Sequence, residues 1–455
     1  MSPSSSSGYN ILPGTTILLK NLPAVHDLDN QKTLAPFAIG IDFNFFDLGS
    51  STTTNNSKLT QLKGIKLIDS GLHFIHYVNT SLGIRAGFYI NCHEGDLFIF
   101  QWDNNLEEFK VFLFDKKNEL IFDNTKTNKR KIEQVDDDVD EYSLNFTMWK
   151  KDVLDDYSYM INYSTLSNQE NFTNQDWKSQ ISHVSMDLIN EIFPKQGRPT
   201  FNNQVSSILS TLDASKEENE KLLTALYNSA SERLNNVNTK QASADLENDP
   251  MIKALKSEVA NELRYTTLEF KKTIRPNASL QQVTADSLDK SWYLKNLVET
   301  QFGGYGWNRL IGELQVAFIN LCILNNFNSG EQWINLVKLI LMSFNAIEEN
   351  QIFYILFLEK LLLQLNKLPV ELVEDGEQEQ EAILKLKSLT TTFNNFKRFI
   401  FYDIESNDKE IKEIQKMTLK LLGVLNSKFN MFIKVEDDDE DDEDDDDYKP
   451  VIVDV

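Results

Sequence analysis

The sequence predicts a multidomain α+β protein, with an antiparallel β-sandwich-like domain first, an all-α domain second and a disordered acidic tail last. Up to about Lys117, apolar and polar residues alternate with a period of two, which is typical of half-buried strands. From Met251 onwards, apolar residues recur at helical spacing instead. Glu436–Asp447 is an unbroken run of twelve acids, which repel one another and oppose folding.

Short strands are predicted throughout the N-terminal part. The clearest alternation lies in Ile39–Phe45 and in Leu72–Tyr77. Further strands are expected at Ala86–Ile90, Asp96–Trp102 and Glu108–Phe114, each bounded by Gly or Asn. Strands at such intervals favour an antiparallel sandwich or barrel.

The chain is expected to turn helical at the end of this domain. Tyr142–Trp149 is predicted to return as a strand, and Asp152–Phe193 to be helical with one apolar face. A hinge-like run and a polar amphipathic helix then predict a linker up to Pro250. The predicted divisions are 1–193 for the β-rich domain, 194–250 for the linker, 251–433 for the helical domain and 434–455 for the tail.

The helical part is organised around a helical hairpin in Gly312–Leu341. Two apolar stripes at helical spacing are separated by turn residues between Asn325 and Gly330. Ser329 followed three residues later by Gln332 predicts a capping box at the start of the second helix. Five or more helices, at about 310–325, 330–346, 350–367, 377–402 and 408–432, predict a bundle or a superhelical stack.

Two stretches of this part contain distinctive sequence motifs. In Leu263–Leu294 a tyrosine and an aromatic residue precede an I-R-P step, and L-D-K-S-aromatic-aromatic-L follows. The hairpin contributes G-E-L-Q-x-A-F and then Q-W. With these motifs the chain resembles the AAR-two family of cistron splicing factors, although Val316 stands where the pattern has an aromatic. The matching residues are Tyr265, Phe270, Ile274, Arg275, Pro276, Leu288, Asp289, Lys290, Ser291, Trp292, Tyr293, Gly312, Glu313, Leu314, Gln315, Ala317, Phe318, Gln332 and Trp333.

The same resemblance extends to the N-terminal domain and to the tail. In the former it rests on Gly64–Lys66, the strand with His73 and His76, Gly87 and Cys92. The family's acidic tail is followed by a P-x-I-V step, matched here by Pro450, Ile452 and Val453. The resemblance covers most of Ile39–Ala346 and the tail, and it implies that the helical domain is VHS-like.

The resemblance implies an assembly chaperone of the U-five small nuclear ribonucleoprotein, which acts in pre-mRNA splicing and is not an enzyme. The implied partner is the particle's large scaffold protein, Prp-eight. The chaperone would bind the RNase-H-like and Jab/MPN domains of that scaffold. While bound, the chaperone would block premature RNA and helicase binding, in the cytoplasm and the nucleus. The alternative is a VHS-like cargo or peptide adaptor unrelated to splicing.

The last residues form the predicted partner-binding segment. Val451–Val453 are strong strand formers, and the acidic run before them provides an unfolded tether. This is the format of a peptide that adds a strand to the open sheet edge of a partner. A frayed terminus is the alternative. The candidate residues are Pro450, Val451, Ile452, Val453, Asp454 and Val455.

Ser343, at the end of the second hairpin helix, is a candidate regulatory site. A phosphate there would meet the negative end of the helix dipole and loosen a packed surface. An ordinary helical serine is the alternative.

Charge favours a protein partner over nucleic acid. The net charge is −24, and without the run of twelve acids the chain still carries −12. A phosphate-binding surface would need clustered Lys and Arg, whereas an acidic chain attracts basic protein surfaces.

The most apolar segment, Ile352–Leu368, is interrupted by Glu359, Lys360 and Gln364 and is interpreted as a buried helix rather than a membrane span. The free chain is expected to be a monomer.

No catalytic, cofactor or metal site is predicted. The phosphate-loop, dinucleotide and nucleophile-elbow motifs are absent from the sequence. His73, His76, Cys92 and His93 lack zinc-site spacing, and His73 and His76 would lie on opposite faces of one strand, so all four are interpreted as ordinary strand residues. Cys92 and Cys322 are far apart in apolar runs, which favours free buried thiols over a disulfide.

Overall fold

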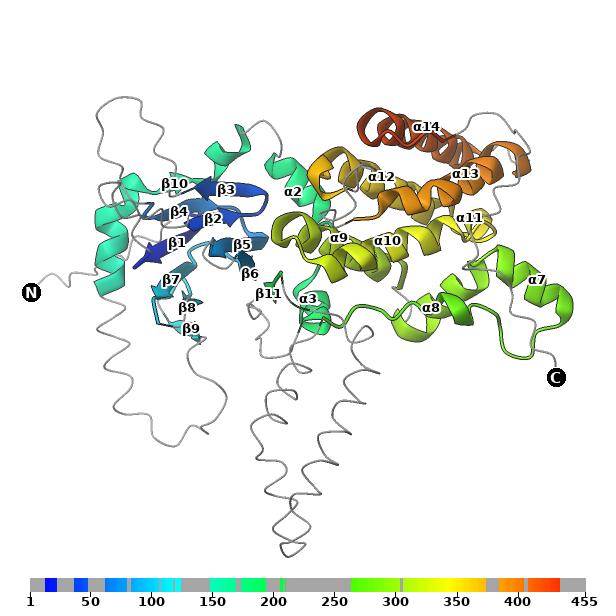
Figure 1. Cartoon of the computed structure of the whole chain (residues 1–455). Coiled ribbons are helices and arrows are strands. Elements are labelled where there is room, and N and C mark those ends of the chain that lie inside the picture. The colour runs from blue at the N-terminus through cyan, green and yellow to red at the C-terminus, as the bar shows by residue number, and fades with distance from the viewer. Residues whose placement is uncertain are drawn as a thin grey trace, which may run out of the picture.

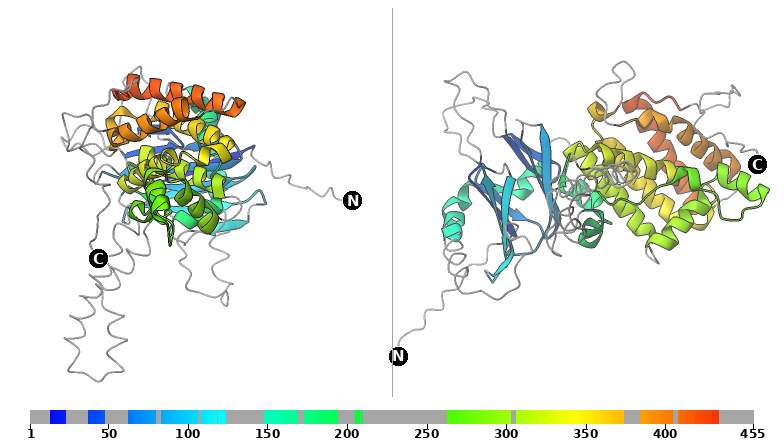
Figure 2. Two further views of the ribbon diagram at one scale, coloured as in Figure 1. Left: turned by 90° about the vertical axis from the view of Figure 1, so that its right-hand side faces the viewer. Right: turned by 60° about the horizontal axis from the view of Figure 1, so that its bottom comes forward.

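Four layers follow one another along the molecule: a helix over 148–156, a six-stranded sheet, a five-stranded sheet and a helical part (Figures 1 and 2). The computed structural model therefore confirms the two-part α+β architecture. It describes residues 13–22, 37–47, 62–79, 83–105, 108–117, 119–123, 148–168, 173–193, 205–207, 209, 263–302, 306–373, 384–404 and 408–433.

The two sheets form a sandwich with the order β10-β4-β1-β7-β8-β9 in one sheet and β11-β6-β5-β2-β3 in the other. Most neighbouring strands are antiparallel, but β1 runs parallel to β7 and β10 runs parallel to β4. The predicted sandwich is therefore confirmed and is mostly antiparallel, and β1 lies parallel to β7 because the chain crosses to the five-stranded sheet between them. The strands are β1 (Thr15–Lys20), β2 (Phe37–Ile41), β3 (Asn44–Asp47), β4 (Gly64–Ile68), β5 (Gly71–Asn79), β6 (Ile84–Cys92), β7 (Leu97–Asp103), β8 (Glu108–Phe114), β9 (Leu120–Asp123), β10 (Ile161–Asn162) and β11 (Val205–Ser206).

Alternation along the strands gives each sheet two apolar faces. In β5, Ile75 and Tyr77 face the other sheet, where Tyr77 contacts the rings of Trp102 and Phe109. The neighbouring Phe74 faces the helical part instead. The outer face of the six-stranded sheet is covered by the helix over 148–156 through residues such as Trp149. Met148 and Trp149 are therefore helical, and the predicted strand Tyr142–Trp149 is wrong at these two residues. The residues before Met148 lie outside the described ranges.

The helical part consists of one short helix pair beside the sheet and a larger group after Leu263. The predicted hairpin is confirmed as α9 and α10, although each helix begins a few residues earlier than expected. The helices are α2 (Asn174–Gln180), α3 (Met186–Ile192), α7 (Leu280–Leu288), α8 (Ser291–Phe302), α9 (Gly306–Leu324), α10 (Phe327–Leu341), α11 (Ala346–Glu349), α12 (Gln351–Lys367), α13 (Thr390–Arg398) and α14 (Lys409–Phe429).

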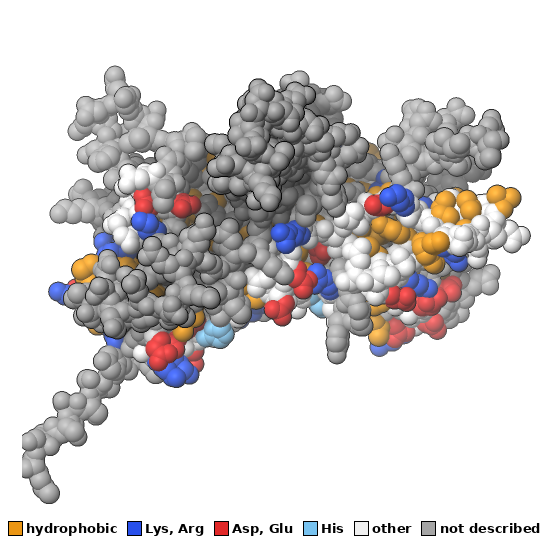
Figure 3. All heavy atoms as spheres, turned by 90° about the horizontal axis from the view of Figure 1, so that it is seen from below, with side chains coloured by type: hydrophobic (Ala, Val, Ile, Leu, Met, Phe, Trp, Pro, Cys, Tyr) orange, Lys and Arg blue, Asp and Glu red, His pale blue; other side chains and the backbone are white. Residues whose placement is uncertain are grey.

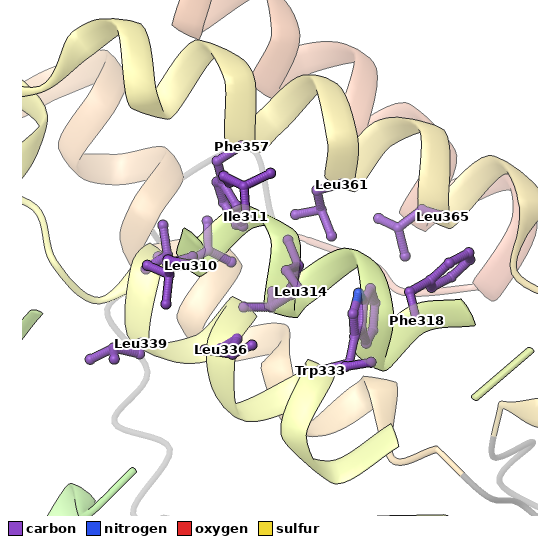
Figure 4. Packing of buried hydrophobic residues seen from close by; sticks show 14 of the residues in the cluster. Leu310, Ile311, Leu314, Phe318, Trp333, Leu336, Leu339, Phe357, Leu361 and Leu365 are labelled. Carbon is purple, nitrogen blue, oxygen red and sulfur yellow. The ribbon is translucent and has the colours of Figure 1, made fainter. Parts of the chain in front are cut away.

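Helix α9 lies at the centre of the helical part and is buried along almost its whole length. Figure 4 shows Leu314 and Phe318 of α9 facing α10 and α12, and the rings of Phe318 and Trp333 lie 6.0 Å apart. The predicted cap of α10 is wrong. Asn326 is the N-cap and its Oδ1 accepts from the Ser329 N–H at 2.8 Å, so Ser329 lies inside the first turn.

One continuous apolar cluster joins the five-stranded sheet to the helices. It includes Phe74 and Tyr89 from the sheet, Leu188 of α3 and Leu314 of α9. Strand β11, which pairs with β6, lies within the range predicted as a linker, and most of that range lies outside the described residues. Within the described ranges, no helix is both long and apolar enough to cross a membrane.

Candidate functional site

The residues singled out from the sequence as sites have different outcomes. Pro450–Val455 lie outside the described residues, so their role stays a prediction. Ser343 is fully buried, and its hydroxyl donates to the Leu339 carbonyl at 2.8 Å. The Tyr354 hydroxyl donates to the Ser343 carbonyl at 2.6 Å. A kinase could reach Ser343 only if this end of α10 opened, and the regulatory role stays a prediction with that condition.

Helix α7 is attached to the body by charged hydrogen bonds rather than by apolar packing. The Arg275 guanidinium binds both oxygens of the Asp286 carboxylate, at 2.6 and 2.8 Å, and these hydrogen bonds lower the pKa of Asp286. The Lys290 ammonium donates to Thr273 Oγ1 and to the carbonyls of Asp286 and Ser287, each at 2.9 Å. Asp286 is the buried residue of α7, so the helix turns its polar side inwards.

The apolar residues of α7 consequently face solvent. Leu280 is 84% exposed and Leu288 is 71% exposed, and Ile274 beside Arg275 is 40% exposed. Figures 1 and 2 show α7 at the far end of the helical part, and Figure 3 shows hydrophobic side chains at that end of the molecule. We call Ile274, Leu280 and Leu288 the α7 ridge. Exposed apolar surface at one end of a folded molecule is typical of a protein-binding surface.

The segment after α7 is tied to the end of α10. Asp289 accepts from the Phe344 N–H at 2.6 Å and from the Asn345 side chain at 2.9 Å. The Ser291 hydroxyl donates to Asp289 and accepts from the Ala346 N–H, both at 2.8 Å. Asp289, Lys290 and Ser291 of the L-D-K-S motif therefore hold α7 in place, whereas Leu288 of the same motif belongs to the exposed α7 ridge.

Glu313 connects three segments within the helical part. Its carboxylate accepts from the Thr266 N–H at 2.9 Å, the Thr266 hydroxyl at 2.7 Å and the Gln332 side chain at 2.8 Å. Burial raises the pKa of Glu313, while the hydrogen bonds from Thr266 oppose that rise. These bonds hold the extended segment around Thr266 against α9 and α10.

A chain of hydrogen bonds crosses from the sheet to the helices. The Tyr89 hydroxyl of β6 donates to Asn320 at 2.9 Å, and Asn320 donates to the Tyr265 hydroxyl at 3.1 Å. Tyr265 is hydrogen bonded to the Ser329 hydroxyl at 2.8 Å. Since all four side chains are buried, this chain fixes how the sheet and the helices sit together.

Gln315 of α9 makes a further cross-link to the segment around α2. Its Oε1 accepts from the His183 N–H at 3.0 Å and its Nε2 donates to the Ser179 carbonyl at 3.1 Å. One turn earlier, Gly312 passes so close that an added Cβ would lie 2.3 Å from the His183 carbonyl oxygen. Gly312 and Gln315 of the G-E-L-Q motif therefore hold α9 against the segment around α2, a role that the sequence did not reveal.

A buried polar cluster around Asp42 lies within the sandwich. The Asp42 carboxylate binds His73 Nδ1 at 2.9 Å, the Tyr163 hydroxyl at 2.5 Å and the Phe74 N–H at 3.0 Å. Burial works to lower the pKa of His73, but the charge of Asp42 and its hydrogen bond raise it overall. His76 lies on the opposite face of β5, as predicted, and donates to the Asp42 carbonyl at 2.8 Å. Both histidines are thus residues of β5, and both are buried partners of Asp42, which the sequence did not reveal.

His76 should make stability depend on pH. Burial lowers its pKa from 6.5 to about 3, so the folded chain keeps this ring neutral while the unfolded chain protonates it below 6.5. Its stabilisation is complete above pH 6.5 and is lost as the pH falls towards 3. In His76→Gln, the fall of the unfolding free energy with pH over that interval is expected to be shallower by about 1.4 kcal/mol per pH unit. Urea denaturation at several pH values measures this slope. The control is His93→Gln, which alters an exposed ring and should leave the slope of the parent chain unchanged. Equal slopes in the two variants would contradict the role of His76 in the pH dependence.

The described residues hold no site for a metal ion. No group of three His, Cys, Asp or Glu side chains within these ranges could bind one. Cys92 and Cys322 are free, and burial raises the pKa of both thiols. Neither cysteine therefore carries a reactive thiolate.

Comparison with known proteins gives matches in both parts of the molecule. Residues 13–194 match the family model for the AAR2 N-terminal domain, and residues 265–434 match that for the AAR2 C-terminal repeat region. The chain is similar to the human "Protein AAR2 homolog", with 21% identity over 80% of this chain and 78% of the relative. It is also similar to the "A1 cistron-splicing factor AAR2" of Saccharomyces cerevisiae, with 26% identity over 68% of this chain and 70% of the relative. The Caenorhabditis elegans "Protein AAR2 homolog" is 21% identical over 86% of this chain and 89% of its own length.

Proposed function

The chain belongs to the AAR2 family, and from that premise we propose that it is a pre-mRNA splicing assembly factor that works by binding another protein. The observation that carries the proposal is the match to both family domains, together with a relative named as a cistron-splicing factor. It acts without catalysing a reaction.

The proposed partner is the large scaffold protein of the U-five particle. Residues 1–193 and 251–433 act as two domains, joined by the linker 194–250, that grip its RNase-H-like and Jab/MPN domains. The tail 434–455 adds a strand through Pro450–Val455 and shields basic surface. Bound in this way, the factor keeps RNA and the helicase away from the scaffold until late in assembly, in the cytoplasm and the nucleus.

Three features support binding of one large partner by a single rigid unit. The hydrogen bonds through Asn320 fix the sheet against the helices, and those of Gln315 fix α9 against the segment around α2, so surfaces on both parts keep a constant spacing. The α7 ridge offers apolar contact area at one end. The net charge of −24 attracts a basic surface.

Deleting Pro450–Val455 tests the role of the tail. We expect affinity for the purified scaffold domains to fall by at least about tenfold, because backbone pairing and apolar side chains are lost together. Isothermal titration at two salt concentrations measures it, and the loss should persist at high salt. Replacing the acids of Glu436–Asp447 by serine is the control, whose smaller effect should fade with salt. Unchanged affinity after the deletion would remove the tail from the interface.

The α7 ridge has a separate test. The double variant Leu280→Ala and Leu288→Ala should bind the scaffold about tenfold more weakly, since buried anchors dominate interfaces. Its own stability should change by less than about 0.5 kcal/mol, because both side chains are exposed in the free chain. The matched control is Leu154→Ala with Leu419→Ala, two other exposed leucines. Equal affinities of the two double variants would exclude α7 from the interface.

A further inference from the structure

A cleft of about 550 Å³ opens where the starts of three helices meet α11. Trp307 and Asn308 come from the first turn of α9, Glu348 and Glu349 from α11, and Glu410 from the first turn of α14. The start of α12 completes the lining with Gln351, Ile352, Phe353 and Leu356. The volume lies in the range of ligand-binding clefts, which is about 300–1,000 Å³.

Part of the cleft's lining is apolar. The rings of Trp307 and Phe353 lie 4.5 Å apart between their centroids, which fixes both side chains. Leu356 is half-buried in the lining, and Ile352 is 78% exposed at its edge. Ile352 and the half-buried Trp307 thus line one cleft and offer apolar surface that the described residues leave exposed.

Another part of the lining is acidic. Glu348 and Glu349 are exposed, Glu410 is half-exposed, and none of the described lining residues is a lysine or arginine. Glu349 is in an ion pair with Lys295 at 2.5 Å, whereas Glu348 and Glu410 are in no ion pair with a described residue. Two carboxylates are therefore available for a cation beside the apolar surface.

The start of α12 adds backbone donors. Its N-cap residue, Asn350, makes no side-chain hydrogen bond to the first turn, and its side chain donates to the Ala346 carbonyl instead. The first N–H groups of α12 lie among the lining residues and lack a capping side chain. A carbonyl of a bound polypeptide would supply the missing acceptor.

We propose that this cleft is a second binding site, for a basic peptide segment of a partner protein in which arginine or lysine stands next to an apolar residue. The cation meets the Glu348 and Glu410 carboxylates and can stack on the Trp307 ring. The neighbouring apolar side chain packs on Ile352 and Leu356. A phosphate-bearing ligand would be repelled by the same carboxylates. The proposed site does not require that the scaffold is the partner, so its test is independent of the test of the proposed function.

A labelled peptide of alternating leucine and arginine is the probe, titrated into the full chain and followed by fluorescence anisotropy. A peptide with glutamate in place of arginine should not bind, and one with alanine in place of leucine should bind more weakly. Because the acids of Glu436–Asp447 also attract arginine, a photoreactive leucine in the probe locates the contact by mass spectrometry. Cross-links are expected within Gln351–Leu356. Cross-links confined to the acidic run would overturn the proposal.

Paired variants separate the cleft from general surface charge. Glu348→Gln with Glu410→Gln should weaken binding of the leucine–arginine peptide about tenfold. The control, Glu94→Gln with Asp155→Asn, removes two exposed acids elsewhere and should leave the affinity unchanged. Ile352→Ser keeps the charge and should weaken binding about fivefold, compared with no effect of Leu419→Ser. Equal losses in the cleft and control variants would overturn the proposal.

Discussion

Replacing Glu313 by alanine is expected to lower the free energy of unfolding by about 4 kcal/mol. The change removes three hydrogen bonds to a buried carboxylate. The Thr266 N–H loses its acceptor, and the Gln332 amide keeps only its hydrogen bond to the Thr266 carbonyl. Each bond to a charged group contributes about 1.5–3 kcal/mol, and orphaned buried donors add their own desolvation cost. The lost volume adds a small cavity between α9 and the segment around Thr266.

Urea denaturation of the two proteins measures this effect, with the midpoint falling and the slope unchanged. Glu313→Gln should cost less, because its amide oxygen can still accept one hydrogen bond. Glu299→Ala, at an exposed position on α8, is the control and should stay within about 0.5 kcal/mol of the parent chain. A cost below about 1 kcal/mol for Glu313→Ala would mean that these hydrogen bonds do not hold the helical part together.

Gly312→Ala is the second substitution with a large expected effect, of about 3 kcal/mol or more. The new methyl group would lie 2.3 Å from the His183 carbonyl oxygen and 2.6 Å from Leu188 Cδ2. Backbone cannot move aside as a flexible side chain can, so α9 must shift away from the segment around α3. That shift would also strain the Gln315 hydrogen bonds to His183 and Ser179.

Gly423→Ala on α14 is the matched control for Gly312→Ala. An added Cβ at Gly423 would meet nothing within 4 Å, so the usual helix preference for alanine should stabilise the chain by about 0.5–1 kcal/mol. Thermal unfolding of both variants should therefore shift in opposite directions. A Gly312→Ala variant as stable as the parent would contradict the close packing of α9 on this segment.

Local pattern was enough to predict the layers of this molecule. Period-two alternation identified most strands and helical spacing identified α9 and α10, although several strands are buried on both faces and α9 is buried along almost its whole length. Pattern could not predict that β1 would lie beside β7, because strands of the other sheet intervene between them in sequence. It also placed the cap of α10 at Ser329 rather than Asn326, since both residue types cap helices well.

The buried hydrogen bonds between segments could not be predicted because their partners are distant in sequence. Asp42 meets Tyr163, 121 residues away, and Tyr89 meets Asn320, 231 residues away. Helix α7 shows a different limit: its spacing gives a stripe with Leu280 and Leu288, but not which side faces solvent. Only the ion pair of the buried Asp286 with the partly exposed Arg275 decides that.

The central claim, that this chain acts by occupying surfaces of the large splicing scaffold, has a direct test. Mass spectrometry of the proteins that co-purify with the full-length chain after nuclease treatment identifies its partner without assuming one. The account predicts that the scaffold protein of the U-five particle is recovered in near-equal amount, and that the Leu280→Ala and Leu288→Ala double variant recovers much less of it. Recovery of the chain without the scaffold would contradict the account.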